Sequence, residues 1–488
     1  MSELPPPDSR RAAREASQPT AAFPAMMSPT PQAPIEQPPQ GPGLTRLQRG
    51  LIIGASALIF VLLATGSVFF GISVGRTTAS HIPLPEPTTA TRATPASQVQ
   101  PAAIPTCSLD TLSSVPAVMK LYGSVVETAT GNSLYSNNDT TGVRPASVLK
   151  VLTASAAIAV LGPSYQITTS VVEVEPGTIA LIGQGDATLS STGHTVYTGA
   201  ATLSSLASST ITAYEANPAN AGVPIAHLIL DSTYWDPNDN WDETVPRSEQ
   251  TGGYLSESTA LQVDGDRANP AAQVSPRSTD PVGHAGTAFV AALVAAHDGP
   301  DAGSVTTVKQ ATPAGATALA SVRSQPVSTL VKQMLATSDN TLGEMLARIM
   351  SVKQSLGGTG DSIGSSTLKG LATYGLDTTG VTIEDGSGES DGSLIPALFM
   401  SKFMSLVSQK TNGLQYVAAG IPVVGKYSAK SGVIATAYTI SGYTTAADGT
   451  GESFTFFAEG TGITSAAQPA LAALANAVYT CGKNITNY

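Results

Sequence analysis

At 488 residues the chain is longer than one hydrophobic core usually serves, so two or more domains are expected. Hydrophobic residues make up 42% of the chain and charged residues only 12%, which suits a globular protein with many small side chains. The net charge of −11 comes with no basic stripe that could neutralise phosphates, which argues against nucleic acid as a partner.

The first segment with a clear physical character is apolar and lies near the N-terminus. Leu51–Val74 contains no charged residue, and a helix of this length spans the hydrocarbon core of a bilayer, about 30 Å. We therefore predict a transmembrane helix over 50–75, preceded by a disordered cytoplasmic tail over 1–49. A cleaved signal peptide is one alternative, but its apolar core is usually shorter, about 7–15 residues. A buried core helix is disfavoured because the segment is apolar on all faces.

Flanking charges predict the orientation of this helix. Five arginines precede it, whereas Arg76 and Arg92 alone follow it closely. The positive-inside rule then places the N-terminus in the cytoplasm and everything after Arg76 outside the membrane, beyond a proline-rich tether over 76–106. In an oxidising compartment the two cysteines, Cys107 and Cys481, would pair and join the ends of the folded region. Two unrelated buried thiols are the alternative.

The folded region is predicted to be discontinuous, with one domain formed by 107–165 and 321–488 and an insert over 166–320. Two strands, 121–127 and 133–136, flank a turn at Gly131, and a strongly apolar helix follows from about Val148. In the insert, charge clusters and turn residues become more frequent. Two helices, three strands and a last helix are expected after it, over 326–335, 341–354, 426–431, 436–444, 453–459 and 469–478. The second and third of these strands are predicted to form a hairpin across the turn Ala447-Asp448-Gly449. This order indicates α plus antiparallel β, not alternating βαβ units.

Ser147 and Lys150 stand three residues apart at the start of the apolar helix, so their side chains share one face. A serine hydroxyl becomes a nucleophile when a base takes its proton. The five histidines lie far from this point in the sequence, which weakens a Ser-His-Asp interpretation. A lysine that is desolvated, or placed beside a second cation, can be neutral and act as the base. The pair predicts attack by Ser147 on a carbonyl, giving an acyl-enzyme.

Two further motifs follow in order along the chain. Ser338-Asp339-Asn340 predicts a turn in which Ser338 relays a proton to the leaving amine and Asn340 binds a substrate amide. Lys430-Ser431-Gly432 fits an edge strand whose lysine attracts a substrate carboxylate, whose serine hydroxyl binds it, and whose glycine admits the substrate backbone. The backbone N–H groups of Ser147 and Val433 are then candidates for an oxyanion hole.

Each motif alone has a structural alternative. Ser147 could be a helix cap, Ser338-Asp339-Asn340 could lead into a capping box at Thr341 and Glu344, and Lys430 could be a solvated strand lysine. Ser-x-x-Lys also occurs a second time, at Ser366-Thr367-Leu368-Lys369. The ordered set of three motifs favours the catalytic interpretation.

Two other patterns are set aside. Gly360-Asp361-Ser362-Ile363-Gly364 matches a nucleophile elbow, but a loop precedes it where a strand is required, and no histidine follows it. The acidic run from Asp236 to Asn240 lacks the glycine of a calcium loop and is interpreted as a polar loop. No metal and no cofactor are expected.

The ordered motifs resemble those of peptidase family S13, the class C low-molecular-mass penicillin-binding proteins. The resemblance covers roughly 115–480 and includes Asp385-Gly386-Ser387-Gly388, which matches a family loop near the active site. Lys430-Ser431-Gly432 has serine where the family more often has threonine, and Glu389 stands where the family tends to have an apolar residue. The 191-residue separation of Ser147 from Ser338 resembles the family's large insert, which holds two small nested domains.

The resemblance implies an α+β, penicillin-binding/β-lactamase-like transpeptidase domain with a five-stranded antiparallel sheet, helices and the site between them. It also implies a D-alanyl-D-alanine carboxypeptidase/endopeptidase that acts on peptidoglycan stem peptides and is acylated by β-lactams. Two rival functions remain: a catalytically silent wall-binding scaffold of the same fold, and a β-lactamase.

Overall fold

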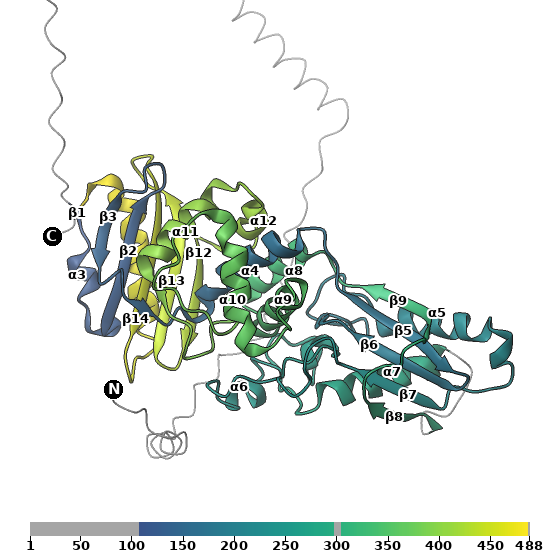
Figure 1. Cartoon of the computed structure of the whole chain (residues 1–488). Coiled ribbons are helices and arrows are strands. Elements are labelled where there is room, and N and C mark those ends of the chain that lie inside the picture. The colour runs from purple at the N-terminus through teal and green to yellow at the C-terminus, as the bar shows by residue number, and fades with distance from the viewer. Residues whose placement is uncertain (1–106, 297–303, 487–488) are drawn as a thin grey trace, which may run out of the picture. The chain divides into compact units, whose positions relative to one another are not determined.

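The computed structural model describes residues 107–296 and 304–486 (Figure 1). The predicted tail, transmembrane helix and tether, 1–106, lie outside the described residues and stay predictions. Within the two described ranges, no helix combines the length and the apolar character needed to cross a membrane.

The larger sheet is antiparallel and is built from both ends of the folded region (Figure 1). Its strands, in spatial order, are β11 (Val423–Val424), β12 (Tyr427–Ile434), β13 (Ala437–Thr445), β14 (Gly451–Glu459), β2 (Lys120–Glu127) and β3 (Ser133–Asn137). The hairpins β2–β3 and β13–β14 confirm the two predicted from turn residues. The prediction of five strands was one too few, because the two-residue β11 adds a sixth at the edge.

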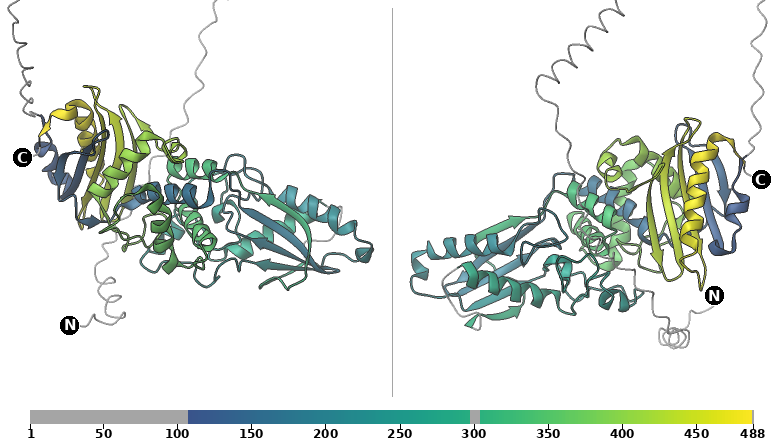
Figure 2. Two further views of the ribbon diagram at one scale, coloured as in Figure 1. Left: turned by 45° about the horizontal axis from the view of Figure 1, so that its top comes forward. Right: turned by 180° about the vertical axis from the view of Figure 1, so that it is seen from behind.

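Two helices cover opposite faces of this sheet. Phe454 and Phe456 of β14 belong to the core formed with α13 (Ala467–Cys481), whereas Phe457 belongs to the core formed with α11 (Ala397–Gln409). Successive side chains of β14 point to opposite faces of the sheet, so the strand contributes to two separate hydrophobic cores. The rear view in Figure 2 shows α13 lying along the strands. α13 was expected from the sequence, whereas α11 was not.

A helical subdomain lies beside the sheet and surrounds α4 (Leu149–Leu161). Every residue of α4 from Leu149 to Ile158 is buried, as expected for a helix that is apolar all round. The helices packed against it are α8 (Val327–Thr337), α9 (Asn340–Lys353), α10 (Gly360–Leu371) and α12 (Leu414–Ala418). Neighbours on all sides fix the start of α4, where Ser147 lies.

The insert carries its own sheet and its own core. The strands, in spatial order, are β8 (Thr306–Lys309), β7 (His227–Asp231), β6 (Thr178–Gly183), β5 (Thr168–Glu175) and β9 (Thr317–Arg323). β6 pairs with β7, and β7 with β8, in parallel. The chain crosses between them through α5 (Leu203–Glu215) and α7 (Pro281–Ala296), so the insert contains βαβ units, which were not predicted. The domain limits at 166 and 320 stay predictions.

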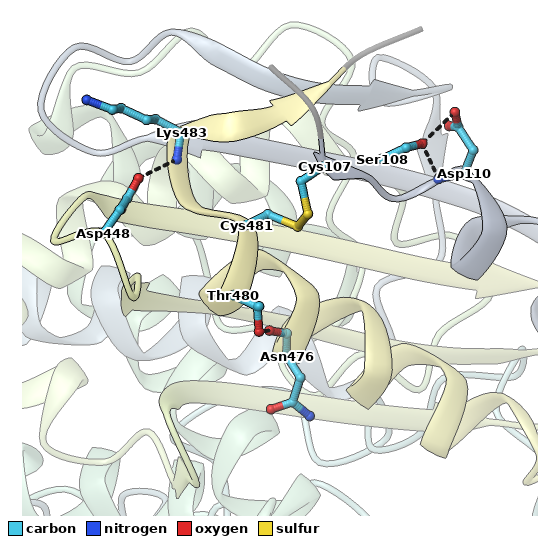
Figure 3. Close-up of a disulfide and its surroundings, with 8 residues drawn as sticks. All are labelled: Cys107, Ser108, Asp110, Asp448, Asn476, Thr480, Cys481 and Lys483. Carbon is cyan, nitrogen blue, oxygen red and sulfur yellow. Dashed lines mark hydrogen bonds between the residues drawn. A yellow bond between two sulfur atoms is a disulfide. The ribbon is translucent and has the colours of Figure 1, made fainter. Parts of the chain in front are cut away.

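The two ends of the described chain meet at the outer side of the larger sheet. β1 (Cys107–Ser108) pairs in parallel with β15 (Ile485–Thr486), and α3 (Asp110–Ser113) follows β1. A disulfide joins Cys107 to Cys481 with their Cα atoms 5.6 Å apart (Figure 3). A second small ladder joins β4 (Gly142–Val143) to β10 (Ile395–Pro396).

Candidate active site

Ser147 lies in a single turn of 3-10 helix, Ala146–Val148, that runs directly into α4. Ala146, the residue before it, has a φ of 46°, in the left-handed region where a side chain costs free energy. The Ala146 carbonyl lies against Gly388, whose own φ is 90° and whose missing Cβ leaves room for that oxygen. The turn is thus shaped by the loop facing it, and Ser147 is only 6% exposed.

Lys150 is fully buried and contacts three oxygen atoms. Its Nζ lies 2.8 Å from Ser147 Oγ, 2.6 Å from Asn340 Oδ1 and 2.7 Å from the Ser387 carbonyl oxygen. The amide and carbonyl oxygens can only accept hydrogen bonds. A neutral lysine would give its two N–H groups to them and keep its lone pair for the Ser147 hydroxyl.

Burial lowers the pKa of Lys150, while the carboxyl groups of Glu389, Asp385, Glu344 and Asp339 act in the opposite direction. The net direction is downward, which is the direction a lysine general base requires.

Ser338 and Asn340 lie at the junction of two helices. Ser338 ends α8 with a φ of 58°, and Asn340 begins α9. The cap of α9 is Asp339, whose Oδ1 accepts the Leu342 N–H at 3.0 Å. The alternative of a capping box at Thr341 and Glu344 does not hold, because Glu344 instead accepts the Gly386 N–H at 3.1 Å.

Asp339 also ties the insert to the active site. Its Oδ2 accepts from Arg267 Nη2 at 2.8 Å and from the Tyr197 hydroxyl at 3.1 Å, and Arg267 donates to that hydroxyl at 2.6 Å. Burial by itself raises the pKa of Asp339, but the charges of Arg267 and Arg277, together with the hydrogen bonds from Leu342 and Arg267, outweigh burial and hold the pKa below its usual value. The middle residue of the motif is thus an ionised anchor, and its two neighbours contact the two lysines: Ser338 contacts Lys430, and Asn340 contacts Lys150.

Lys430 reaches the same place from β12. Its Nζ donates to Ser338 Oγ at 2.9 Å and to the Ser431 carbonyl at 2.6 Å. Burial, assisted by the charge of Lys150, lowers the pKa of Lys430 to about 7. The alternative of a solvated strand lysine does not hold, because Lys430 is 3% exposed.

Gly432 brings β12 against the nucleophile. A Cβ at this position would collide with the Ser147 backbone nitrogen and with Thr439 Oγ1. Ser431 and Val433 are exposed on the same strand. β11 pairs with Tyr427 and Ser428, and the Ala429 N–H donates to the Pro422 carbonyl at 3.0 Å, so in the described parts of the chain the edge of β12 from Lys430 onward is unpaired. The roles of Ser431, Gly432 and Val433 in binding substrate stay predictions.

The patterns set aside from the sequence lie in other surroundings. Gly360 begins α10, so the serine of the apparent nucleophile elbow, Ser362, lies inside a helix and not at a strand-to-helix turn. In the polar loop, Asp239 accepts hydrogen bonds from Arg348 at 3.1 Å and from the Gly360 N–H at 2.8 Å.

Sequence reasoning missed several residues of the site. Glu389 Oε1 accepts from Asn340 Nδ2 at 2.9 Å, and its loop was noticed only through the family resemblance. Tyr197 and Arg267 of the insert could not be recognised as site residues from the sequence, because neither belongs to a motif with fixed spacing. Burial raises the pKa of Glu344 and of Glu389 to about 7, although Lys150 acts in the opposite direction on Glu389.

Known proteins with similar sequences are carboxypeptidases by name. The chain is 30% identical over 368 residues to "Carboxypeptidase Rv3627c" of Mycobacterium tuberculosis, covering 72% of this chain and 75% of that protein. It is 30% identical over 321 residues to "Carboxypeptidase DacB" of Mycolicibacterium smegmatis, covering 64% of this chain and 65% of that protein. The match therefore spans slightly less than two thirds of the length of the M. smegmatis relative. A D-alanyl-D-alanine carboxypeptidase of Actinomadura is 26% identical over 385 residues, covering 62% of this chain and 67% of that protein.

A solved structure with a similar fold is penicillin-binding protein 4 (dacB) of Haemophilus influenzae. The TM-score is 0.60 at 17% sequence identity, and the match covers 74% of this chain and 96% of that one. The model of the D-Ala-D-Ala carboxypeptidase 3 (S13) family matches residues 107–284 and 256–426. The chain that brings Ser147, Lys150 and Asn340 into contact, and Lys430 into contact with Ser338, thus belongs to the D-Ala-D-Ala carboxypeptidase 3 (S13) family.

Proposed function

We propose that this protein is a serine D-Ala-D-Ala carboxypeptidase/endopeptidase that acts on peptidoglycan stem peptides through an acyl-enzyme on Ser147. The observation that carries the proposal is the 2.8 Å contact of Ser147 Oγ with a buried lysine whose two other partners are acceptor-only oxygens. This geometry leaves the lysine lone pair facing the hydroxyl. The names of the relatives and of the family agree with the reaction.

Acylation follows from these contacts. Lys150 takes the Ser147 proton while Oγ bonds to the carbonyl carbon of the penultimate residue. The peptide C–N bond then breaks, and Ser338, hydrogen-bonded to Lys430, relays the proton held by Lys150 to the departing D-alanine amine, which leaves Lys150 neutral and Ser338 protonated again. Water next attacks the ester, returns the proton to Ser147 and releases the shortened peptide.

Substrate binding is assigned to the free edge of β12. An extended peptide can add to an unpaired strand through main-chain hydrogen bonds. Lys430 and the hydroxyl of Ser431 would then hold the terminal carboxylate, Asn340 a substrate amide, and the N–H groups of Ser147 and Val433 the oxyanion. β-Lactams would acylate Ser147 in the same position, and a homologous fold, that of the H. influenzae protein, has been solved with a β-lactam.

The test is the intact mass of the protein after incubation with benzylpenicillin. The wild type is expected to gain one stable adduct, and Ser147→Ala is expected to gain none. Ser366→Ala is the matched control, since it removes the serine of the second Ser-x-x-Lys sequence and should label normally. A wild type that takes no label would remove the basis of the enzymatic proposal.

Two rival functions give different results in the same samples. A silent scaffold would label and yet release no D-alanine from a stem-peptide mimic. A β-lactamase would hydrolyse nitrocefin with many turnovers per minute, whereas a D,D-peptidase should stall after one.

We also propose that the enzyme is held at the outer face of the cell membrane by the apolar segment 51–74. Support comes from the length of that segment and from the disulfide, which forms in oxidising compartments. Protease added to intact spheroplasts should release the described part of the chain. Complete protection of this part, with cleavage only after lysis, would contradict the proposal.

A further inference from the structure

The loop after α10 that faces Ser147 is held by one carboxylate. Asp385 Oδ2 accepts the N–H groups of Gly388 at 2.6 Å, Glu389 at 2.7 Å and Ser390 at 3.2 Å. Its Oδ1 accepts the Ser393 hydroxyl at 2.6 Å. Because three successive N–H groups converge on one oxygen, the backbone of Glu389 is held in one position. This fixes the point from which its side chain extends.

From that origin Glu389 reaches the amide of Asn340. Its Oε1 accepts from Asn340 Nδ2 at 2.9 Å, while the Oδ1 of the same amide accepts from Lys150 Nζ at 2.6 Å. Burial raises the pKa of Glu389 to about 7, so the group is mainly ionised above that pH, where it can only accept hydrogen bonds and requires the NH2 end of the amide to face it. The oxygen end is thereby turned toward Lys150, which is the orientation that leaves the lysine lone pair to Ser147.

The charge of Glu389 acts on the same lysine. Among the carboxyl groups that raise the pKa of Lys150 against the effect of burial, Glu389 is the strongest, followed by Asp385, Glu344 and Asp339. The charge of Lys150 in turn helps to lower the pKa of Lys430 on β12. Glu389 itself faces Glu249 of α6 (Ser248–Thr251) in the insert and Asp385 of its own loop. The chain thus supplies Lys150 as the principal cation for Glu389.

We propose that Glu389 is a positioning residue of the active site: it fixes the amide orientation of Asn340, and its charge sets the acidic limit of acylation. The proposal rests on the proposed function, because it assigns Lys150 as the base. A nearby negative charge favours the protonated lysine, which is inactive as a base. Glu389 carries its charge above about pH 7, so loss of the charge should extend activity from higher pH down toward that value, whereas loss of the hydrogen bond should weaken acylation at every pH.

The experiment is the pH profile of the second-order rate constant for acylation by benzylpenicillin. Glu389→Gln keeps an oxygen that can accept from Asn340 but removes the charge, so its acidic limb should move to lower pH by about half a unit or more at a nearly unchanged plateau. Glu389→Leu removes both, so it should show the same shift and a plateau lower by about fivefold or more. Glu384→Gln is the matched control, because it neutralises an exposed carboxylate of the same loop and should leave the profile unchanged.

Each result has one meaning. Superimposable profiles for wild type and Glu389→Gln would overturn the electrostatic part of the proposal. Equal plateaus for the Gln and Leu variants would overturn the orienting part. Thermal melting of each variant checks that it is folded. Absence of acylation in the wild type would instead contradict the proposed function, so the two failures are distinguishable.

Discussion

Two segments of this chain have the same Ser-x-x-Lys pattern and opposite surroundings. In the first, Lys150 is fully buried and contacts three oxygens, one of them Ser147 Oγ. In the second, which lies within α10, Ser366 is buried and accepts from Gln354 Nε2 at 3.0 Å, while Lys369 is exposed. The comparison shows that spacing places two side chains on one helix face, but burial and partners decide whether the lysine can act as a base.

The serines should separate the two segments most strongly. Ser147→Ala is expected to lower kcat for D-alanine release from a stem-peptide mimic by about 10⁴-fold or more, because no acyl-enzyme can form. Ser366→Ala should leave kcat within about twofold and cost about 1 kcal/mol of unfolding free energy through the lost hydrogen bond. Comparable losses of kcat in both variants would contradict the assignment.

Substitution of the lysines in the two segments should show the same contrast, with a smaller loss of rate than substitution of the serines. Lys150→Met is expected to lower the benzylpenicillin acylation rate by about 10²–10⁴-fold, the usual contribution of a general base. Lys369→Met changes an exposed side chain and should leave the rate unchanged. Stopped-flow mixing with a fluorescent penicillin measures both rates, and a normal rate in Lys150→Met would show that another group takes the proton.

A third lysine, Lys430, sharpens the comparison because it is buried beside Lys150 yet is assigned to bind an anion. With its pKa lowered to about 7, it loses its proton as pH rises through neutrality. The KM for a peptide with a free terminal carboxylate should therefore rise above pH 7, by up to about tenfold per pH unit. In Lys430→Arg, which stays charged, KM should vary little over the same range. A wild-type KM independent of pH would contradict the role in carboxylate binding.

Asp339 links the active site to the insert, because its contacts with Tyr197 and Arg267 hold the neighbouring residue Asn340 in place. Tyr197→Phe removes a hydroxyl that donates to Asp339 and accepts from Arg267. Loss of about 1–2 kcal/mol of unfolding free energy is expected, with an acylation rate lower by a few fold. Tyr254→Phe, at an exposed position of the insert, is the control. Chemical denaturation and labelling kinetics measure the two effects, and an unchanged rate would limit this contact to stability.

Glu452 of β14 is a buried carboxyl group whose raised pKa affects the stability of the protein. It is fully buried, and burial together with the charges of Asp448 and Glu127 raises its pKa to about 8. The folded state thus holds a proton that the unfolded chain releases near 4.5, so this contribution to stability is complete below 4.5 and is lost as pH rises through 8. Glu452→Gln should match the wild type in melting temperature at pH 5 and exceed it at pH 9. An equal difference at both values would show that the carboxyl is not the cause.

Local patterns predicted the parts of the fold that depend on near neighbours in sequence. The turn residues located the two hairpins, and the continuous apolar run located α4. α11 was not expected, because it starts directly after Pro396 without a capping side chain. The parallel strands of the insert were missed because β7 and β8 are short, and all four residues of β8 are exposed, so neither shows the long apolar run of a buried parallel strand.

The residues of the candidate site likewise divide into those predicted from near neighbours in sequence and those that only the fold brings together. Some of its residues could be predicted because they belong to short motifs with close spacing. These residues are Ser147 with Lys150, Ser338 with Asn340, and Lys430. Tyr197 and Arg267 lie 142 and 72 residues from Asp339, so only the folded insert brings them to it. Glu389 was visible as a departure from the family, but its contact with Asn340 depends on how Asp385 folds the loop.

The disulfide between Cys107 and Cys481 has a practical consequence for anyone who prepares this protein. Its partners are 374 residues apart and no third cysteine exists, so a single molecule has no wrong pairing to make. Oxidation in a crowded refolding mixture can still cross-link one copy to another through the same two thiols. Material secreted into an oxidising compartment, where each copy emerges alone, is therefore the better starting point than inclusion bodies.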